Sequence, residues 1–405
     1  MSPMIGFDEI RKLAQVTPSR IVLLVMDGVG GLPHPDTGKT ELETANTPNL
    51  DKLAVESICG MAYTVSPGIT PGSAPGHMSL FGYDPLKYQF GRGIVEALGL
   101  DIEVAPGDVV VRGNFCSVDD DGVITDRRAG RIPTETCREQ CAMLNQGVAV
   151  TGVQVDFFAG KDHRFVMRLR GEGLSQNVGD TDPQHEGMQP LVPEALEPSA
   201  TKTAAIAADI VSQARTILKD RHPANMFVLR GFSERPDYPS INDIYGLTPA
   251  CIAPYPMYRG VSRVVGMDIL PAGDTLEDEI ATLKQNYDKY DYFFMHYKKT
   301  DATGEDGNFE GKVAAIEAYD RLLPSILDLN PDVVIVTGDH STPAGLAGHS
   351  WHTVPVLLSA KYCRKDEVTA YSETACLRGG LGVFPAMELM PLAMANALKL
   401  NKFGA

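Results

Sequence analysis

The sequence lacks a segment that could cross a membrane, because no apolar run approaches the roughly 20 residues that a spanning helix needs. Its first residues, MSPMIGFDEIRKLAQ, include acidic side chains and no apolar core, unlike a secretion signal. Cysteine is scarce, and the seven cysteines lack the spacing of a disulfide framework. Cys137 and Cys141 lie one turn apart on an expected helix, where packing is the commoner role. We therefore expect a cytoplasmic protein with reduced thiols.

Positive charge is also in deficit. The chain has 36 lysines and arginines against 52 aspartates and glutamates, a formal net charge of -16. This balance argues against a nucleic-acid partner, and an anionic ligand would need bound cations or clustered arginines at its site. At 405 residues the chain is long for one domain and sufficient for two.

The most informative stretch is residues 333–355, VVIVTGDHSTPAGLAGHSWHTVP. It opens with a β-branched run that is apolar on both faces, which predicts a buried strand. Asp339 and His340 follow the strand end, and His349 and His352 follow in a glycine-rich loop. One carboxylate with two or three imidazoles at a strand end suits a divalent metal ion, although ordinary loop histidines are the alternative.

A second apolar run, RIVLLVM at residues 20–26, ends at Asp27 and is followed by GVGG. It predicts another buried strand with a carboxylate at its carboxyl end, although the aspartate could be incidental. GVGG is not a dinucleotide fingerprint, because the third glycine and the later acid are missing. Asp301 and Glu305 are close enough in sequence to reach one cation together.

Residues 66–85, SPGITPGSAPGHMSLFGYDP, are rich in glycine and proline and are expected to become helical from about His77. Ser73 lies between Gly72 and Ala74, so it is sterically accessible. A serine just before a helix meets unpaired N–H groups and the positive end of the helix dipole, which would stabilise a phosphate on its oxygen. The alternative is that Ser73 only caps this helix.

Taken in order, DGVGG, TPGSAPGHMSLFGYDP, the TD…GED…FEGK block and TGDHSTP…H…VP resemble the cofactor-independent phosphoglycerate mutases of archaeal type, in the alkaline phosphatase superfamily. The resemblance covers nearly the whole chain. It implies an α/β fold: an alkaline-phosphatase-like three-layer sandwich around a mostly parallel sheet, with a smaller inserted α+β domain. The metal-binding domain would comprise residues 1–107 and 261–405, and the inserted substrate-binding or lid domain residues 108–260.

The resemblance also implies a serine nucleophile beside two divalent metal ions, with Mn or Mg expected before Zn. Ser73 resembles the nucleophile. Asp27, Asp339 and His340 resemble the ligands of the ion that also contacts the serine.

Asp301, Glu305 and His349 would hold the other ion. The family usually has histidine where Glu305 stands, and a carboxylate there favours harder ions. His349 is chosen over His352 because it precedes Pro355 by the family's six residues.

Candidate substrate ligands come mainly from the inserted domain, since an arginine presents a planar fork of donors to phosphate or carboxylate. DRRAGR and KDHR resemble family segments, although any one arginine is more often a surface residue. Arg164 and Arg170 are further polar residues on expected strands. The candidates are Arg128, Arg131, His163, Asp182, Arg230 and, from the metal-binding domain, Lys299.

The expected reaction is the interconversion of 3-phosphoglycerate and 2-phosphoglycerate through a phosphoserine, without bisphosphoglycerate. The expected partner is this small substrate, with no nucleic acid and no membrane, and no oligomeric state follows from the pattern. The alternatives are a metal-dependent phosphatase or phosphonate hydrolase of the same superfamily, another phosphoryl-transfer enzyme such as a homoserine kinase-like relative, and a metal-binding protein without activity.

Overall fold

A computed structural model describes residues 5–404. The chain forms two compact units: Met1–Gln89 with Tyr238–Ala405, here called the large unit, and Phe90–Asp237, here called the insert. Both divisions lie earlier in the chain than the expected ones at 107/108 and 260/261. The expected boundaries followed a shift in composition, whereas the observed ones follow contacts between elements. α5 (Arg92–Gly99) packs on strands of the insert, and β8 (Pro249–Ile252) pairs within the large unit.

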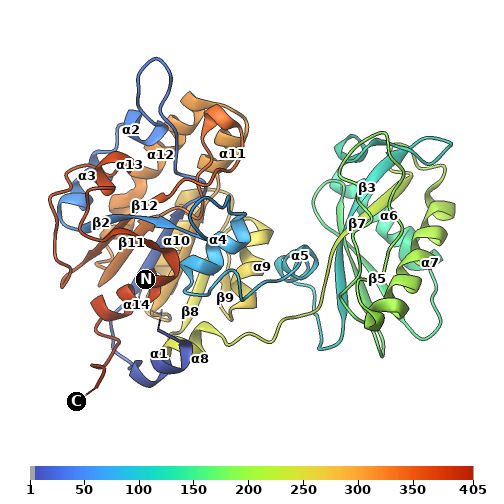
Figure 1. Cartoon of the computed structure of the whole chain (residues 1–405), viewed down its shortest axis with the longest axis horizontal. Helices are drawn as coiled ribbons and strands as arrows, with labels where there is room; N and C mark the ends of the chain where they lie inside the picture. The colour runs from blue at the N-terminus through green and yellow to red at the C-terminus, as the bar shows by residue number, and fades with distance from the viewer. Residues whose placement is uncertain (1–4, 405) are drawn as a thin grey trace. The chain divides into compact units, whose positions relative to one another are not determined.

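An eight-stranded sheet forms the centre of the large unit (Figure 1). In sheet order its strands are β13 (Gly382–Pro385), β2 (Ile58–Tyr63), β12 (Val354–Ala360), β11 (Val333–Thr337), β1 (Ile21–Met26), β10 (Tyr292–Tyr297), β8 (Pro249–Ile252) and β9 (Asp268–Leu270). Among these strands only β12 runs against its neighbours. The predicted α/β fold with a mostly parallel sheet is confirmed.

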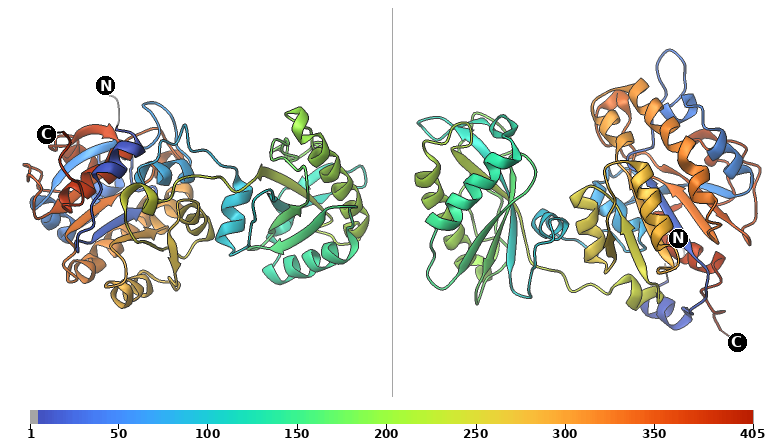
Figure 2. Two further views of the ribbon diagram at one scale, coloured as in Figure 1. Left: turned by 90° about the horizontal axis from the view of Figure 1, so that it is seen from below. Right: turned by 180° about the vertical axis from the view of Figure 1, so that it is seen from behind.

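Helices cover both faces of this sheet because its central strands are apolar on both sides. On one face α3 (Pro48–Val55), α10 (Leu276–Asn286) and α12 (Phe309–Leu327) share a core with β1, β10 and β11. On the other lie α4 (Ser73–Leu80), α9 (Pro256–Val264) and α14 (Leu389–Asn396) (Figure 2). Phe81, which follows α4, packs edge-on against Phe294 of β10. The result is three layers.

The remaining elements of the large unit are short. They are α1 (Phe7–Leu13), α2 (Glu41–Thr44), α8 (Ile241–Tyr245), α11 (Lys299–Glu305), α13 (Glu373–Cys376), and the 3-10 turns η3 (Ala344–Leu346) and η4 (Ala386–Glu388). No helix within residues 5–404 is both long enough and apolar enough to pass through a bilayer.

The insert is an antiparallel sheet backed by two helices, which share a second core with it. β3 (Val109–Val118) lies between β6 (Arg164–Arg170) and β7 (Met226–Ser233). The other elements are β4 (Ile124–Asp126), η1 (Ala129–Arg131), α6 (Thr134–Gly147), β5 (Gln154–Ala159), η2 (Pro198–Ala200) and α7 (Thr201–Leu218).

Candidate functional site

Three neighbouring parallel strands bring the predicted site together at their carboxyl ends. Met26 of β1 is level with Tyr297 of β10, and Val25 is level with Thr337 of β11. The residues that follow each strand therefore meet at one edge of the sheet, where α/β proteins bind ligands. Asp27 comes from the first strand, Lys298 to Asp301 from the second, and Asp339 with His340 from the third.

Asp27 is fully buried and is surrounded by donors. Its Oδ2 accepts hydrogen bonds from His296 Nε2 at 3.0 Å and from the Tyr258 hydroxyl. Burial acts to raise the pKa of Asp27, but the hydrogen bond from His296, the proximity of His340 and the charge of Lys298 outweigh it, so this pKa lies well below its usual range. Asp27 therefore stays ionised inside the protein.

His340 has a defined tautomer. The Thr342 hydroxyl donates to Asp301 Oδ1 at 2.6 Å, so its oxygen accepts from His340 Nδ1 at 2.9 Å. Nε2 of His340 is thereby left with its lone pair, 3.2 Å from Asp27 Oδ1 and 3.2 Å from Asp339 Oδ2. A nitrogen lone pair thus faces two carboxylate oxygens.

Ser73 Oγ lies 3.2 Å from the same His340 Nε2. Ser73 is the first residue of α4 and Gly72 is its N-cap, so the helix starts earlier than the expected His77 and Ser73 does not cap it. Pro75 lies in the first turn, where proline is tolerated, which explains the missed start. His77 Nδ1 donates to the Ser73 carbonyl at 2.8 Å and lies 3.2 Å from Asp339 Oδ2.

His340 also lies close to a second set of possible metal ligands, Asp301 and His349. His349 Nε2 lies 3.7 Å from Asp301 Oδ1, and the His340 and His349 rings stack with centroids 3.6 Å apart. Glu305 Oε1 is also 3.7 Å from His349 Nε2, on a half-exposed side chain at the end of α11. His352 instead contacts Ser350 Oγ at 3.0 Å and stacks on Trp351.

These side chains fit a metal centre. Two groups have ligand atoms mutually within 4.8 Å: Asp27, Asp339 and His340, and Asp301, His340 and His349. Asp27 Oδ1 and Asp339 Oδ2 are buried and accept no hydrogen bond. Buried, unpaired carboxylate oxygens are costly unless a cation compensates them. The fold therefore brings six of the predicted side chains close together, in two groups that could hold a metal ion. The second group contains His340 in place of the predicted Glu305, which lies beside it.

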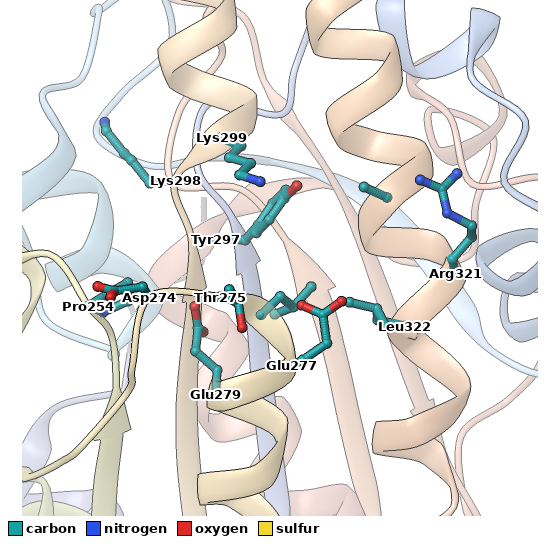
Figure 3. A pocket seen from close by; sticks show the side chains of 12 residues that line it. Pro254, Asp274, Thr275, Glu277, Glu279, Tyr297, Lys298, Lys299, Arg321 and Leu322 are labelled. Atoms are coloured by element: carbon teal, nitrogen blue, oxygen red, sulfur yellow. The ribbon is translucent and has the colours of Figure 1, made fainter.

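A cavity of about 440 Å³ lies next to this site in the large unit, between α10 and α12 (Figure 3). Lys298 and the exposed Lys299 line it, together with Asp274, Glu277 and Glu279. Figure 3 shows the Lys298 ammonium pointing away from the cavity and the Lys299 side chain lying near Tyr297.

In the insert, Asp182 anchors arginines. Its buried carboxylate pairs with Arg127 at 2.7 Å and lies 3.6 Å from Arg230 Nη1. Arg128 and Arg131 are exposed at η1. Asp182 thus faces protein cations, whereas Arg128 and Arg131 stay accessible.

The insert also holds a cluster of neighbouring arginines, here called the cationic cluster: Arg92, Arg112, Arg164 and Arg230. The sequence did not point to Arg92 or Arg112 as functional residues. Burial, and then the neighbouring Arg164, Arg92 and Arg230, lower the pKa of Arg112 to about 10, although Glu96 opposes this. Arg112 lies in an apolar strand run and Arg92 opens α5. The only sequence signal is that a lone arginine inside VVVRGNF interrupts a buried strand.

His163 borders this cluster and is buried. Burial and the charges of Arg164, Arg112 and Arg128 lower its pKa to about 4. Its imidazole is therefore neutral at physiological pH.

Comparison with known proteins identifies relatives of the whole chain. The family described as 2,3-bisphosphoglycerate-independent phosphoglycerate mutase matches residues 54–225. A probable mutase of this kind from Thermus thermophilus is 51% identical, covering 98% of this chain and 99% of its own, and one from Aquifex aeolicus is 49% identical, covering 98% and 100%.

Two solved structures share the fold of this chain. The cofactor-independent phosphoglycerate mutase from Thermoplasma acidophilum superposes with a TM-score of 0.72 at 29% identity, covering 94% of this chain and 100% of its own. A protein from Pyrococcus horikoshii gives 0.83 at 28% identity, covering 96% and 100%. The chain therefore belongs to the family of 2,3-bisphosphoglycerate-independent phosphoglycerate mutases.

Proposed function

We propose that this protein interconverts 3-phosphoglycerate and 2-phosphoglycerate, without bisphosphoglycerate, through a phosphoserine on Ser73. The observation that carries the proposal is the position of Ser73 Oγ, 3.2 Å from His340 Nε2 and beside buried carboxylates. The membership of the family supports the substrate class.

We propose two divalent ions, Mn or Mg before Zn. Asp27, Asp339, His340 and Ser73 would hold one, and Asp301, Glu305 and His349 the other. When bound, such ions neutralise phosphoryl oxygens and lower the pKa of the serine hydroxyl.

The chain's own residues carry the transfer. Ser73 Oγ gives up its proton and attacks phosphorus in line, the bond between phosphorus and the substrate oxygen breaks, and that oxygen takes up a proton, so that glycerate is left beside phosphoserine. The other hydroxyl of glycerate then attacks the same phosphorus and frees Ser73. The first turn of α4 offers the positive end of its dipole to the phosphoryl group.

The insert has a task in this scheme. We propose that its cationic cluster, with Arg128, Arg131 and His163, binds the anionic groups of the substrate. Lys299 would contact the substrate from the large unit. Asp182 would hold Arg127 and Arg230 in position for substrate binding. Retaining glycerate matters, because water would otherwise hydrolyse the intermediate.

The test supplies 3-phosphoglycerate with Mn²⁺ or Mg²⁺ and no bisphosphoglycerate, and resolves the products by ³¹P NMR. The expected product is 2-phosphoglycerate, and the equilibrium should be reached from either side. Release of inorganic phosphate without 2-phosphoglycerate would instead establish the phosphatase alternative.

A further inference from the structure

Lys298 forms ion pairs with both groups of possible metal ligands at the site. It follows β10 directly and is the N-cap residue of α11. Its Nζ lies 3.1 Å from Asp27 Oδ2 and closer still to Asp301 Oδ2. Asp27 belongs to one of these ligand groups and Asp301 to the other. A single ammonium therefore bridges carboxylates that two separate ions would use.

The surroundings favour a cation at this position. Both aspartates are fully buried, whereas the Lys298 side chain is 29% exposed, so the ammonium reaches inward from the surface. Nζ also lies 5.6 Å from the centre of the Tyr258 ring, within the range of a cation–π contact. Without such a charge, the buried carboxylates would repel one another at low dielectric.

The contact also opposes metal binding. Asp301 Oδ1 already accepts from Thr342, so Lys298 holds the other oxygen of the carboxylate that a metal ion would need. At Asp27 the ammonium holds Oδ2, next to the unpaired Oδ1. A fixed positive charge at this distance from both ligands repels an incoming divalent cation.

The cavity beside the site gives the ammonium another position. Lys298 lines it, although its Nζ points away, and the exposed carboxylates of Asp274 and Glu277 are on its wall (Figure 3). Lysine has four rotatable side-chain bonds, so its ammonium can change position without movement of the backbone.

We propose that Lys298 is a built-in counter-cation of the metal-free site, and that its ammonium turns into this cavity when divalent cations bind. The inference rests on the proposed metal site. Lys298 acts as a positioning residue: it holds Asp27 and Asp301 in place without ions and limits the affinity of the site, so that the ions exchange.

The first experiment measures Mn²⁺ binding by calorimetry to metal-free wild type, Lys298→Met and Lys298→Arg. Lys298→Met should bind Mn²⁺ at least about tenfold more tightly, because the competing charge is gone, while Lys298→Arg should stay within about threefold of wild type. Lys299→Met is the matched control: it removes the same charge one residue away without touching either aspartate, and its Mn²⁺ affinity should rise by less than about threefold.

The second experiment needs no variant. Wild-type protein is acetylated briefly with and without Mn²⁺, and each lysine is followed by mass spectrometry. Lys298 should be protected in the metal-free protein and acetylated faster with Mn²⁺, whereas Lys12 on α1 should react equally in both.

Weaker or unchanged Mn²⁺ binding by Lys298→Met overturns the inference, as does acetylation of Lys298 that does not respond to Mn²⁺. Failure of wild type to bind Mn²⁺ would overturn the proposed two-metal function, and this inference with it. Tight binding by both Lys298→Met and Lys299→Met would show a general charge effect and overturn the specific role of Lys298.

Discussion

Glu279 is a buried acid that the fold keeps protonated. It lies on α10 and lines the cavity, its residue is 3% exposed, and its Oε2 has no hydrogen-bond partner. Burial, with a smaller effect from the Asp278 charge, raises the pKa of Glu279 from 4.5 to about 9. In the unfolded chain the same group ionises near its ordinary pKa.

The cost of this burial depends on pH. Below the unfolded pKa both states hold the proton, and the fold keeps its full stability. Between 4.5 and about 9 only the folded state holds it, so the free energy of unfolding falls as pH rises. At about 1.4 kcal/mol per pH unit over the 2.5 units from 4.5 to pH 7, the loss attributable to Glu279 reaches about 3.5 kcal/mol at pH 7. Glu279→Gln cannot ionise, so it should be more stable than wild type by about this amount at pH 7.

Urea unfolding followed by tryptophan fluorescence measures this difference, because Trp351, the single tryptophan, lies in the large unit. Wild type should lose stability from pH 5 to pH 8.5 relative to Glu279→Gln. Glu277→Gln is the control: this neighbour on α10 is exposed, and its removal should leave the wild-type pH dependence intact. Parallel pH profiles for wild type and Glu279→Gln would refute the reasoning.

Three further predictions concern the site and its support. Ser73→Ala should abolish mutase activity while Mn²⁺ binding by calorimetry survives, and full activity would remove Ser73 from the mechanism. Gly76→Ala should destabilise the protein by about 1–3 kcal/mol and weaken Mn²⁺ binding, because a Cβ there would lie 2.3 Å from the Asp339 carbonyl oxygen; Gly345→Ala, which meets open space, is its control in thermal unfolding. Lys312→Met should cost about 3 kcal/mol or more, because its buried ammonium donates to three loop carbonyls and these three charge-assisted hydrogen bonds would be lost; unchanged urea stability would contradict this.

The ends of β1 and β11 could be predicted because a buried parallel strand is a continuous apolar run, and the residue after it must face the sheet edge. The positions of Asp27 and Asp339 at this edge followed from that rule, whereas the role of Asp27 as a metal ligand came from the resemblance and stays a prediction. Ser73 required the resemblance, since its own surroundings fitted a capping residue equally well. The assignment of Glu305 as a ligand stays a prediction.

The supporting residues could not be predicted, because their roles depend on contacts between distant segments. Lys312 reads as an ordinary lysine of an amphipathic helix, yet it is buried and its ammonium donates to carbonyls of the loops at Gly28 to Gly30 and at Thr342. Tyr258 and His296 reach Asp27 from more than 200 residues away. Strand runs and motifs carry no information on such pairings.

The place of β1 between β10 and β11 has a consequence for biosynthesis. This strand leaves the ribosome early, yet both of its partners are translated only after the whole insert. Until then Ile21–Met26 is an unpaired, wholly apolar edge, which is the kind of segment that aggregates or binds chaperones. The insert can meanwhile fold around its own core. A nascent chain halted before residue 292 should therefore contain a folded insert and a large unit that is not yet folded.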